Sequence, residues 1–334
     1  MIRSSFSDLF GLRYPIMNAP IASAAGGTLA GIVSNAGALG TIGGSGAAAG
    51  LSVADRLRRE IATCRALTDR PFGVGFISTS TVREDNGRLR VAALQEVALD
   101  EGVQIVMHSF MVPTDLVAEA KRRGAIVICQ VQTLAMAREA LAAGADVLVA
   151  QGYDGGGHVG SIGTMSIVPA IVDLAGHVPV LAAGGIADGR GLAAAMMLGA
   201  QGASIGTRFY ASAEAEVAPY VHDRLIGATT DDTVWTLSYD IVRGVDFGPT
   251  VAGRVVRNAF TDTWHGRDDG ARANASLLLE QLNAGPQGGD PSLASIWSSS
   301  AVGLIGDVEP AGAIVRGICA EAERIIRAGA ARLI

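Results

Sequence analysis

Residues 126–150 read IVICQVQTLAMAREALAAGADVLVA and contain a complete strand–helix–strand unit. The β-branched run Ile126–Gln130 predicts a buried strand, Leu134–Ala143 has the spacing of a helix, and Val147–Ala150 predicts a second strand. Gly144 lies where the glycine after a helix end is expected. The chain therefore alternates strand and helix here, which favours parallel pairing of the two strands.

The same alternation extends along the chain on both sides of this unit. Further strands are expected at Pro15–Asn18, Leu39–Ile42, Gly73–Ile77, Val103–Met107, Val180–Ala182 and Ala203–Ile205. Helices are expected between them, at Val53–Ala66, Leu94–Glu101, Asp115–Arg123, Ser166–Leu174 and Arg190–Leu198. Eight strands in about 200 residues are typical of a TIM barrel, (β/α)8. The alternative is a doubly wound open sheet, but Gly26-Gly27-Thr28-Leu29 after the first strand is no GxGxxG fingerprint.

After Phe209 the alternation stops, and the chain becomes more polar. The expected fold class is therefore α/β, a TIM barrel with a smaller, mainly helical subdomain after strand eight. We expect the barrel over residues 1–211, the substrate-side subdomain over 212–300, and a C-terminal helix within 301–334 that packs back on the barrel. The Gly and Pro content of Ala284–Pro291 predicts a loop there.

Composition excludes several classes of function. The 334 residues are 49% hydrophobic and 17% charged, and a net charge of −6 argues against nucleic acid as a partner. Three scattered cysteines without a CxxC pair favour a reducing compartment, so we expect a cytoplasmic protein without a metal site. Residues 14–54 carry no charge, but their nine glycines would break a membrane-spanning helix, and no membrane partner is expected.

Two glycine-containing segments predict a phosphate site. In a TIM barrel the site is built from loops at the C-terminal ends of the strands, and the loops after strands seven and eight commonly bind phosphate. Here these loops contain Gly184-Gly185 and Gly206-Thr207. Glycines let backbone N–H groups approach an anion closely, and the Thr207 hydroxyl can add a donor.

A third segment, Gln151–Gly160 after strand six, is half glycine and can lie flat against a planar ligand. We predict that His158 within it is functional, since a flexible glycine loop offers it little packing of its own. His108, at the end of strand four, is a second candidate on the same face. Surface roles are expected for the other histidines, His177, His222 and His265.

Further candidates lie at the ends of strands one, three and five. They are Asn18, Ala19 and Pro20, then Gly75, then Gln130. Polar amides at this rim are suited to the edge of a flavin or a substrate.

Together these segments resemble the nitronate monooxygenase family, formerly called 2-nitropropane dioxygenases. The resemblance covers nearly the whole chain and rests on residues 15–20, 33–40, 71–75, 144–146, 151–160, 179–189, 204–209, 254–259 and 296–298. The glycine–histidine loop and Ala182-Ala183-Gly184-Gly185-Ile186-Ala187-Asp188-Gly189 are its most specific pair.

The resemblance implies an FMN-dependent oxidoreductase that oxidises alkyl nitronates with O2. FMN would be bound non-covalently, with its phosphate at Gly184-Gly185 and Gly206-Thr207. Gln151, Gly155 and Gly156 would lie along the flavin, and His158 would be the catalytic acid/base, because its ordinary pKa suits removal of a proton from a neutral nitroalkane.

Two positions depart from common family patterns, and they leave other functions open. Asn18-Ala19-Pro20-Ile21 stands where one family form has Gln-Ala-Pro-Met, and Gly75 stands where many relatives carry Asn. Relatives with the same barrel use NAD(P)H to reduce a quinone or an enoyl thioester, and Trp297-Ser298 resembles these. A non-enzymatic flavin-binding barrel is the alternative from another class. Assembly as a homodimer is left open.

Overall fold

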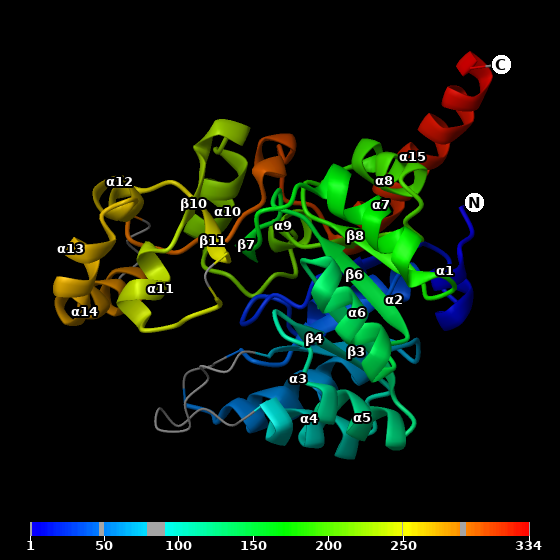
Figure 1. Cartoon of the computed structure of the whole chain (residues 1–334), viewed down its shortest axis with the longest axis horizontal. Helices are drawn as coiled ribbons and strands as arrows, with labels where there is room; N and C mark the ends of the chain where they lie inside the picture. The colour runs from blue at the N-terminus through cyan, green and yellow to red at the C-terminus, as the bar shows by residue number, and fades with distance from the viewer. Residues whose placement is uncertain (1, 47–49, 79–90, 249, 288–291, 334) are drawn as a thin grey trace.

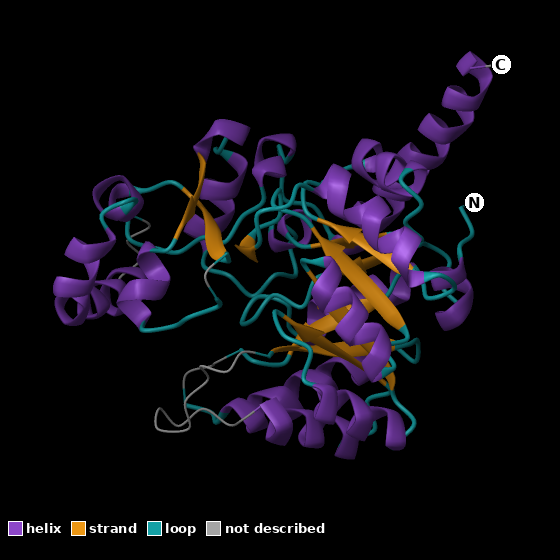
Figure 2. Ribbon diagram, in the orientation of Figure 1, coloured by secondary structure: helices purple, strands orange, loops and turns teal. Residues whose placement is uncertain are grey.

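The computed structural model describes residues 2–46, 50–78, 91–248, 250–287 and 292–333. At its centre lies an eight-stranded sheet in the order β1-β9-β8-β6-β5-β4-β3-β2, with every pairing parallel. These strands are β1 Ile16–Asn18, β2 Gly40–Gly43, β3 Phe72–Ile77, β4 Ile105–Ser109, β5 Ile126–Val131, β6 Val147–Gln151, β8 Val180–Ala183 and β9 Ala203–Ile205. A bridge between Met17 and Leu39 brings the two ends of the sheet together, so the expected TIM barrel is confirmed (Figures 1 and 2).

Helices between the strands cover the outside of the barrel (Figure 1). They are α2 Gly27–Ala36, α3 Val53–Leu67, α4 Val91–Asp100, α5 Thr114–Arg122, α6 Leu134–Ala143, α7 Thr164–Ala175, α8 Gly189–Met197 and α9 Thr207–Tyr210. Helix α6 illustrates why the sequence located them well: the Thr133 hydroxyl accepts from Met136 N at its start, and Gly144 ends it with a φ of 92°.

A short helix near the start of the chain was not expected from the sequence. Helix α1, Ser5–Phe10, places Phe6 and Phe10 among the residues that fill the barrel, including Met17 and Leu39. Ser4 begins it with a reciprocal cap to Ser7. The apolar contents of the barrel are therefore covered by α1, as expected for a packed core without a pore.

The region after α9 contains more strand than its composition suggested. Its elements are α10 Pro219–Ile226, η2 Thr230–Asp232, β10 Thr233–Thr236, α11 Ser238–Arg243, β11 Ala252–Val256, α12 Ala259–Trp264, α13 Asp268–Ala273, α14 Ala275–Gln287 and η3 Ser300–Leu304. Strands β10 and β11 pair antiparallel with each other, and β11 pairs with β7, Gly157–Val159. The expected glycine loop after strand six therefore contains a strand, because a partner almost 100 residues away supplies its hydrogen bonds.

The expected loop at Ala284–Pro291 needs a correction too. Residues 284–287 form the last turn of α14, and residues 288–291 lie outside the described residues. The final helix, α15 Ala311–Leu333, packs against α2 and α8, and its end projects from the body of the molecule (Figure 1). Within the described ranges, no helix has both the length and the apolar character needed to cross a membrane.

Candidate active site

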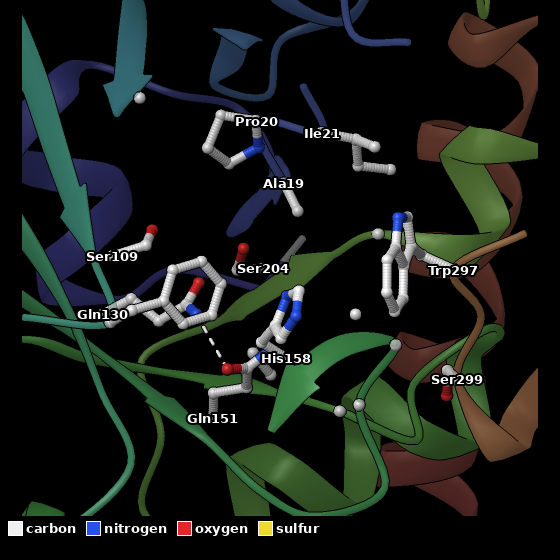
Figure 3. A pocket seen from close by; sticks show the side chains of 18 of the residues that line it. Ala19, Pro20, Ile21, Ser109, Gln130, Gln151, His158, Ser204, Trp297 and Ser299 are labelled. Carbon is white, nitrogen blue, oxygen red and sulfur yellow. Dashed lines mark hydrogen bonds between the residues drawn. The ribbon is translucent and has the colours of Figure 1, made fainter. Parts of the chain in front are cut away.

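A cavity of about 240 Å³ opens at the C-terminal ends of the barrel strands. Each predicted site residue except Asn18 lines this cavity: Ala19, Pro20, Gly75, Gln130, Gln151, Gly155, Gly156, His158, Gly184, Gly185, Gly206 and Thr207. Parallel strands end at the same edge of a barrel, which explains why residues so far apart in sequence converge. Figure 3 shows Ala19 and Pro20 on one side of the cavity and the rings of His158 and Trp297 projecting into it.

Three glutamine side chains form a network along one wall. The amides of Gln130 and Gln132 both donate to Gln151 Oε1, at 2.8 and 2.7 Å, and Gln132 also donates to the His158 carbonyl at 2.9 Å. Gln130 and Gln151 meet because β5 and β6 are neighbours, as the dashed line in Figure 3 shows. Since Gln151 Oε1 accepts twice, the orientation of the Gln151 amide is fixed. Gln132 was missed because it lies one residue beyond β5.

The two expected phosphate loops are joined by a residue that sequence reasoning missed. Ser299 N donates to Thr207 Oγ1 at 2.9 Å, and Gly185 N donates to Ser299 Oγ at 3.3 Å. The Thr207 hydroxyl therefore accepts from the protein, which leaves its own hydrogen for a ligand. Gly184 and Gly185 have φ values of 100° and 76°, a conformation that side chains disfavour. Ser299 is 92 residues beyond Thr207, and no local pattern signals this contact.

His158 is tightly packed, contrary to the expectation of a loosely held loop residue. Its ring stacks on Phe247 with centroids 3.6 Å apart, and it also contacts Trp297 at 4.9 Å and Phe110 at 5.8 Å. Its Nε2 lies 2.8 Å from Asp240 Oδ1. The side chain is 13% exposed. These partners come from other segments of the chain, so they could not be predicted from the glycine-rich sequence around His158.

A scan against protein-family models matches residues 3–321 to nitronate monooxygenase. The chain belongs to this family. It is 35% identical to a nitronate monooxygenase from Neurospora crassa, over 93% of this chain and 90% of the relative. It is also 35% identical to a hydroxy-methyl-oxo-octahydroindene-carboxyl-CoA dehydrogenase from Mycobacterium tuberculosis, over 72% of this chain. That match spans 64% of the relative's length.

Two solved structures are similar to this chain over nearly its whole length. FabK from Thermotoga maritima superposes with a TM-score of 0.85 and 32% identity, over 99% of this chain and 100% of that one. A nitroalkane oxidase from Streptomyces ansochromogenes superposes with a TM-score of 0.82 and 27% identity, over 98% and 100%. The family resemblance inferred from the sequence is confirmed, and the chain is a flavin-dependent oxidoreductase.

Asn18 is the first of the two positions that depart from common family patterns, and it does not line the cavity. Its side chain is fully buried; Oδ1 accepts from Thr41 N and Nδ2 donates to Thr41 O, both at 2.8 Å. The amide thus joins β1 to β2 at the seam where the barrel closes. The Asn18 side chain is therefore bonded within the barrel and does not line the cavity, so a contact between it and the cofactor stays an untested prediction.

Gly75, the second departure, has a steric explanation. A Cβ built on Gly75 would lie 2.3 Å from Pro20 Cγ and 2.5 Å from Pro20 Cβ. Pro20 therefore occupies the volume that a side chain at position 75 would fill. In this chain, the cavity wall beside Gly75 is therefore formed by Pro20, which lies in the loop after β1.

His108, the second histidine candidate, points away from the cavity. Successive strand residues face opposite sides, and it is the next residue, Ser109, that lines the cavity. His108 Nδ1 accepts from Ser78 Oγ at 2.9 Å, and Nε2 donates to Gln95 Oε1 at 2.8 Å. Burial lowers the pKa of His108 from 6.5 to about 4. His108 is therefore a neutral structural histidine, and none of His177, His222 and His265 lines the cavity either.

Phe110 introduces backbone strain at the rim. It follows β4 directly and has a φ of 75°, which is rare for a bulky residue. Its ring lies against both His158 and Phe247. Such strain commonly marks functional sites, and here it aims an aromatic ring at the histidine.

Proposed function

We propose that the protein is an FMN-dependent nitronate monooxygenase that oxidises alkyl nitronates with O2. The observation that carries this proposal is that His158 lines a glycine-rich cavity in a member of the nitronate monooxygenase family. The relative from Neurospora crassa has this activity by name and matches over most of both chains.

The lining residues fit a phosphorylated flavin. Seven glycines leave backbone exposed to a flat ligand, and they are Gly75, Gly155, Gly156, Gly157, Gly184, Gly185 and Gly206. Among the described residues that line the cavity there is no Lys or Arg, so the phosphate would be held by backbone N–H and hydroxyl groups. Bound FMN would supply the electron acceptor, and the protein supplies binding and orientation.

FMN binding is tested by extraction and by one substitution. The purified protein should release FMN and no FAD on denaturation. Gly185→Val should abolish flavin retention, because a branched side chain resists the positive φ and its Cβ would meet Asp154 Cβ at 3.1 Å. Gly176→Val is the matched control: it also places a branched residue at a positive φ, at a position with open space, outside the cavity lining. Normal flavin content in folded Gly185→Val would contradict the phosphate assignment.

His158 is proposed to remove the proton of a neutral nitroalkane. His158→Asn should keep its flavin, since the phosphate loops are elsewhere in the cavity. Turnover of a neutral nitroalkane should fall by roughly 10²–10⁴, the usual contribution of a general base. Turnover of preformed nitronate, which has already lost that proton, should fall much less. Equal losses on both substrates would make His158 a binding residue instead.

A second candidate function rests on the names of two relatives. Proteins from Mycobacterium tuberculosis and Rhodococcus jostii, 35% and 29% identical, are carboxyl-CoA dehydrogenases by name. Their names favour an enzyme that acts on a CoA thioester, and the alternative inferred from the sequence is an NAD(P)H-linked reductase of a quinone or an enoyl thioester. Anaerobic mixing separates the two functions: nitronate should bleach the flavin, whereas bleaching by NADH or NADPH alone would favour the second.

A further inference from the structure

The residue that faces the proposed base is Asp240, which lies in α11, outside the barrel. Its Oδ1 is 2.8 Å from His158 Nε2, across 82 residues of sequence. Asp240 is only 5% exposed. A carboxylate removed from water to this degree carries a substantial desolvation cost unless a charged or donating partner offsets it. Here the imidazole is that partner.

The hydrogen bond has a defined direction. A carboxylate can only accept, so Nε2 of His158 carries the hydrogen that it donates to Asp240. In a neutral imidazole the lone pair then resides on Nδ1, because only one ring nitrogen is protonated. Among the described residues, Nδ1 has no hydrogen-bond partner. It is the nitrogen left to exchange a proton with a ligand.

Holding the ring in place does not require a charge at this position. The ring already stacks on Phe247, contacts Trp297 and Phe110, and belongs to a strand paired with β11. The His158 carbonyl is fixed by Gln132 as well. A carboxylate adds two effects to these apolar and backbone contacts. It fixes the ring hydrogen on Nε2, and it supplies a negative charge next to the imidazolium.

We propose that Asp240 is a positioning residue that holds His158 as its Nε2–H tautomer, makes Nδ1 the proton acceptor, and stabilises the imidazolium that forms. This inference rests on the proposed role of His158. It assigns to the region after the barrel a part in proton transfer that is exerted through His158. In that step a substrate C–H bond breaks, the proton moves to Nδ1, and the electron pair stays on the resulting nitronate.

The tautomer is tested without using activity. In protein labelled with ¹⁵N-histidine, the ring signals of His158 are identified by their loss in His158→Asn. Wild-type protein should show hydrogen on Nε2. In Asp240→Asn the amide can donate to Nε2, so the Nδ1–H form should gain population. Asp262→Asn is the matched control, because this exposed carboxylate in α12 pairs with Arg257 and does not line the cavity; its spectrum should match wild type.

Activity gives the second readout. Asp240→Asn should retain flavin, lose roughly 10²–10⁴ in turnover of a neutral nitroalkane and lose much less on preformed nitronate. An Nδ1–H form in wild-type protein overturns the inference, and this result does not depend on whether Asp240→Asn folds. Unchanged tautomer and unchanged turnover in folded Asp240→Asn also overturn it. If wild-type protein oxidises neither substrate, the proposed function fails, while the wild-type spectrum still decides the tautomer.

Discussion

Pro20 and position 75 share one volume between β1 and β3, so their substitutions should be coupled. Gly75→Ala should displace Pro20, cost about 1–3 kcal/mol of stability through overpacking and weaken flavin binding. Adding Pro20→Gly should restore much of the loss, because glycine lacks both of the Pro20 atoms, Cγ and Cβ, that the new methyl group would meet. A double-mutant cycle of thermal stability and flavin affinity measures this coupling. Gly160→Ala is the control, since its Cβ would meet Gln132 at an ordinary 3.5 Å; strictly additive effects at positions 20 and 75 would contradict the steric explanation.

At the same scale, the sequence located those cavity-lining residues that a local pattern marks. Gly184, Gly185 and Gly206 lie next to the ends of β8 and β9, and His158 lies in the glycine-rich segment after β6; all four line the cavity. Asp240, the residue that faces His158, could not be identified in this way. Side chains from residues 240–299 complete the site, and their approach depends on how β10 and β11 pair. No periodicity or spacing of residues in the sequence predicts that pairing.

At the scale of elements, the eight barrel strands were located because each is a short apolar run next to a helix with its own start and stop signals. Strand β7 was missed because the glycines at 157 and 160 interrupt the alternation of apolar and polar side chains that marks a strand. Its partner, β11, is also remote in the sequence. The β7–β11 pairing opposes His158 to Gly253, whose Cβ would lie 2.1 Å from the Trp297 ring. Glycine at 253 therefore admits the tryptophan to the site, which sequence patterns do not reveal.

His108 links three elements, and its titration should appear in the stability of the fold. It joins β4 to Ser78 and to α4 through Gln95. Its folded pKa of about 4 lies below the ordinary 6.5, so protonation favours the unfolded chain. Stability should be fully present above pH 6.5 and decline as pH falls towards 4, by on the order of 3 kcal/mol. Urea unfolding of His108→Gln should show a smaller decline over this window than wild type. His177→Gln changes an exposed loop position and is the control; its free energy of unfolding should decline with falling pH as in wild type. An identical decline in all three proteins would assign the pH dependence to other groups.

At the scale of the whole molecule, the C-terminal helix supports the loop proposed to bind phosphate. Helix α15 packs along α8, and Glu321 Oε2 accepts from Gly189 N at 2.9 Å. Gly189 begins α8, immediately after the loop that contains Gly184 and Gly185. Some predictions at this scale stay untested: the division of the chain at residues 211 and 300, a cytoplasmic location, and assembly as a homodimer.

The contact between α8 and α15 is close enough to test with one methyl group. A Cβ at Gly189 would lie 2.5 Å from both Ala322 N and Glu321 Cβ, so Gly189→Ala should push α15 away from α8. We expect a stability loss of about 1–3 kcal/mol and weaker FMN binding, because the start of α8 anchors the neighbouring loop. Thermal unfolding and FMN titration of the flavin-free protein measure the two effects. Gly317→Ala, in α15 with open space around its Cβ, should bind FMN normally and gain up to about 1 kcal/mol from helix propensity. If Gly189→Ala loses stability but binds FMN like wild type, α15 supports the barrel and not the loop.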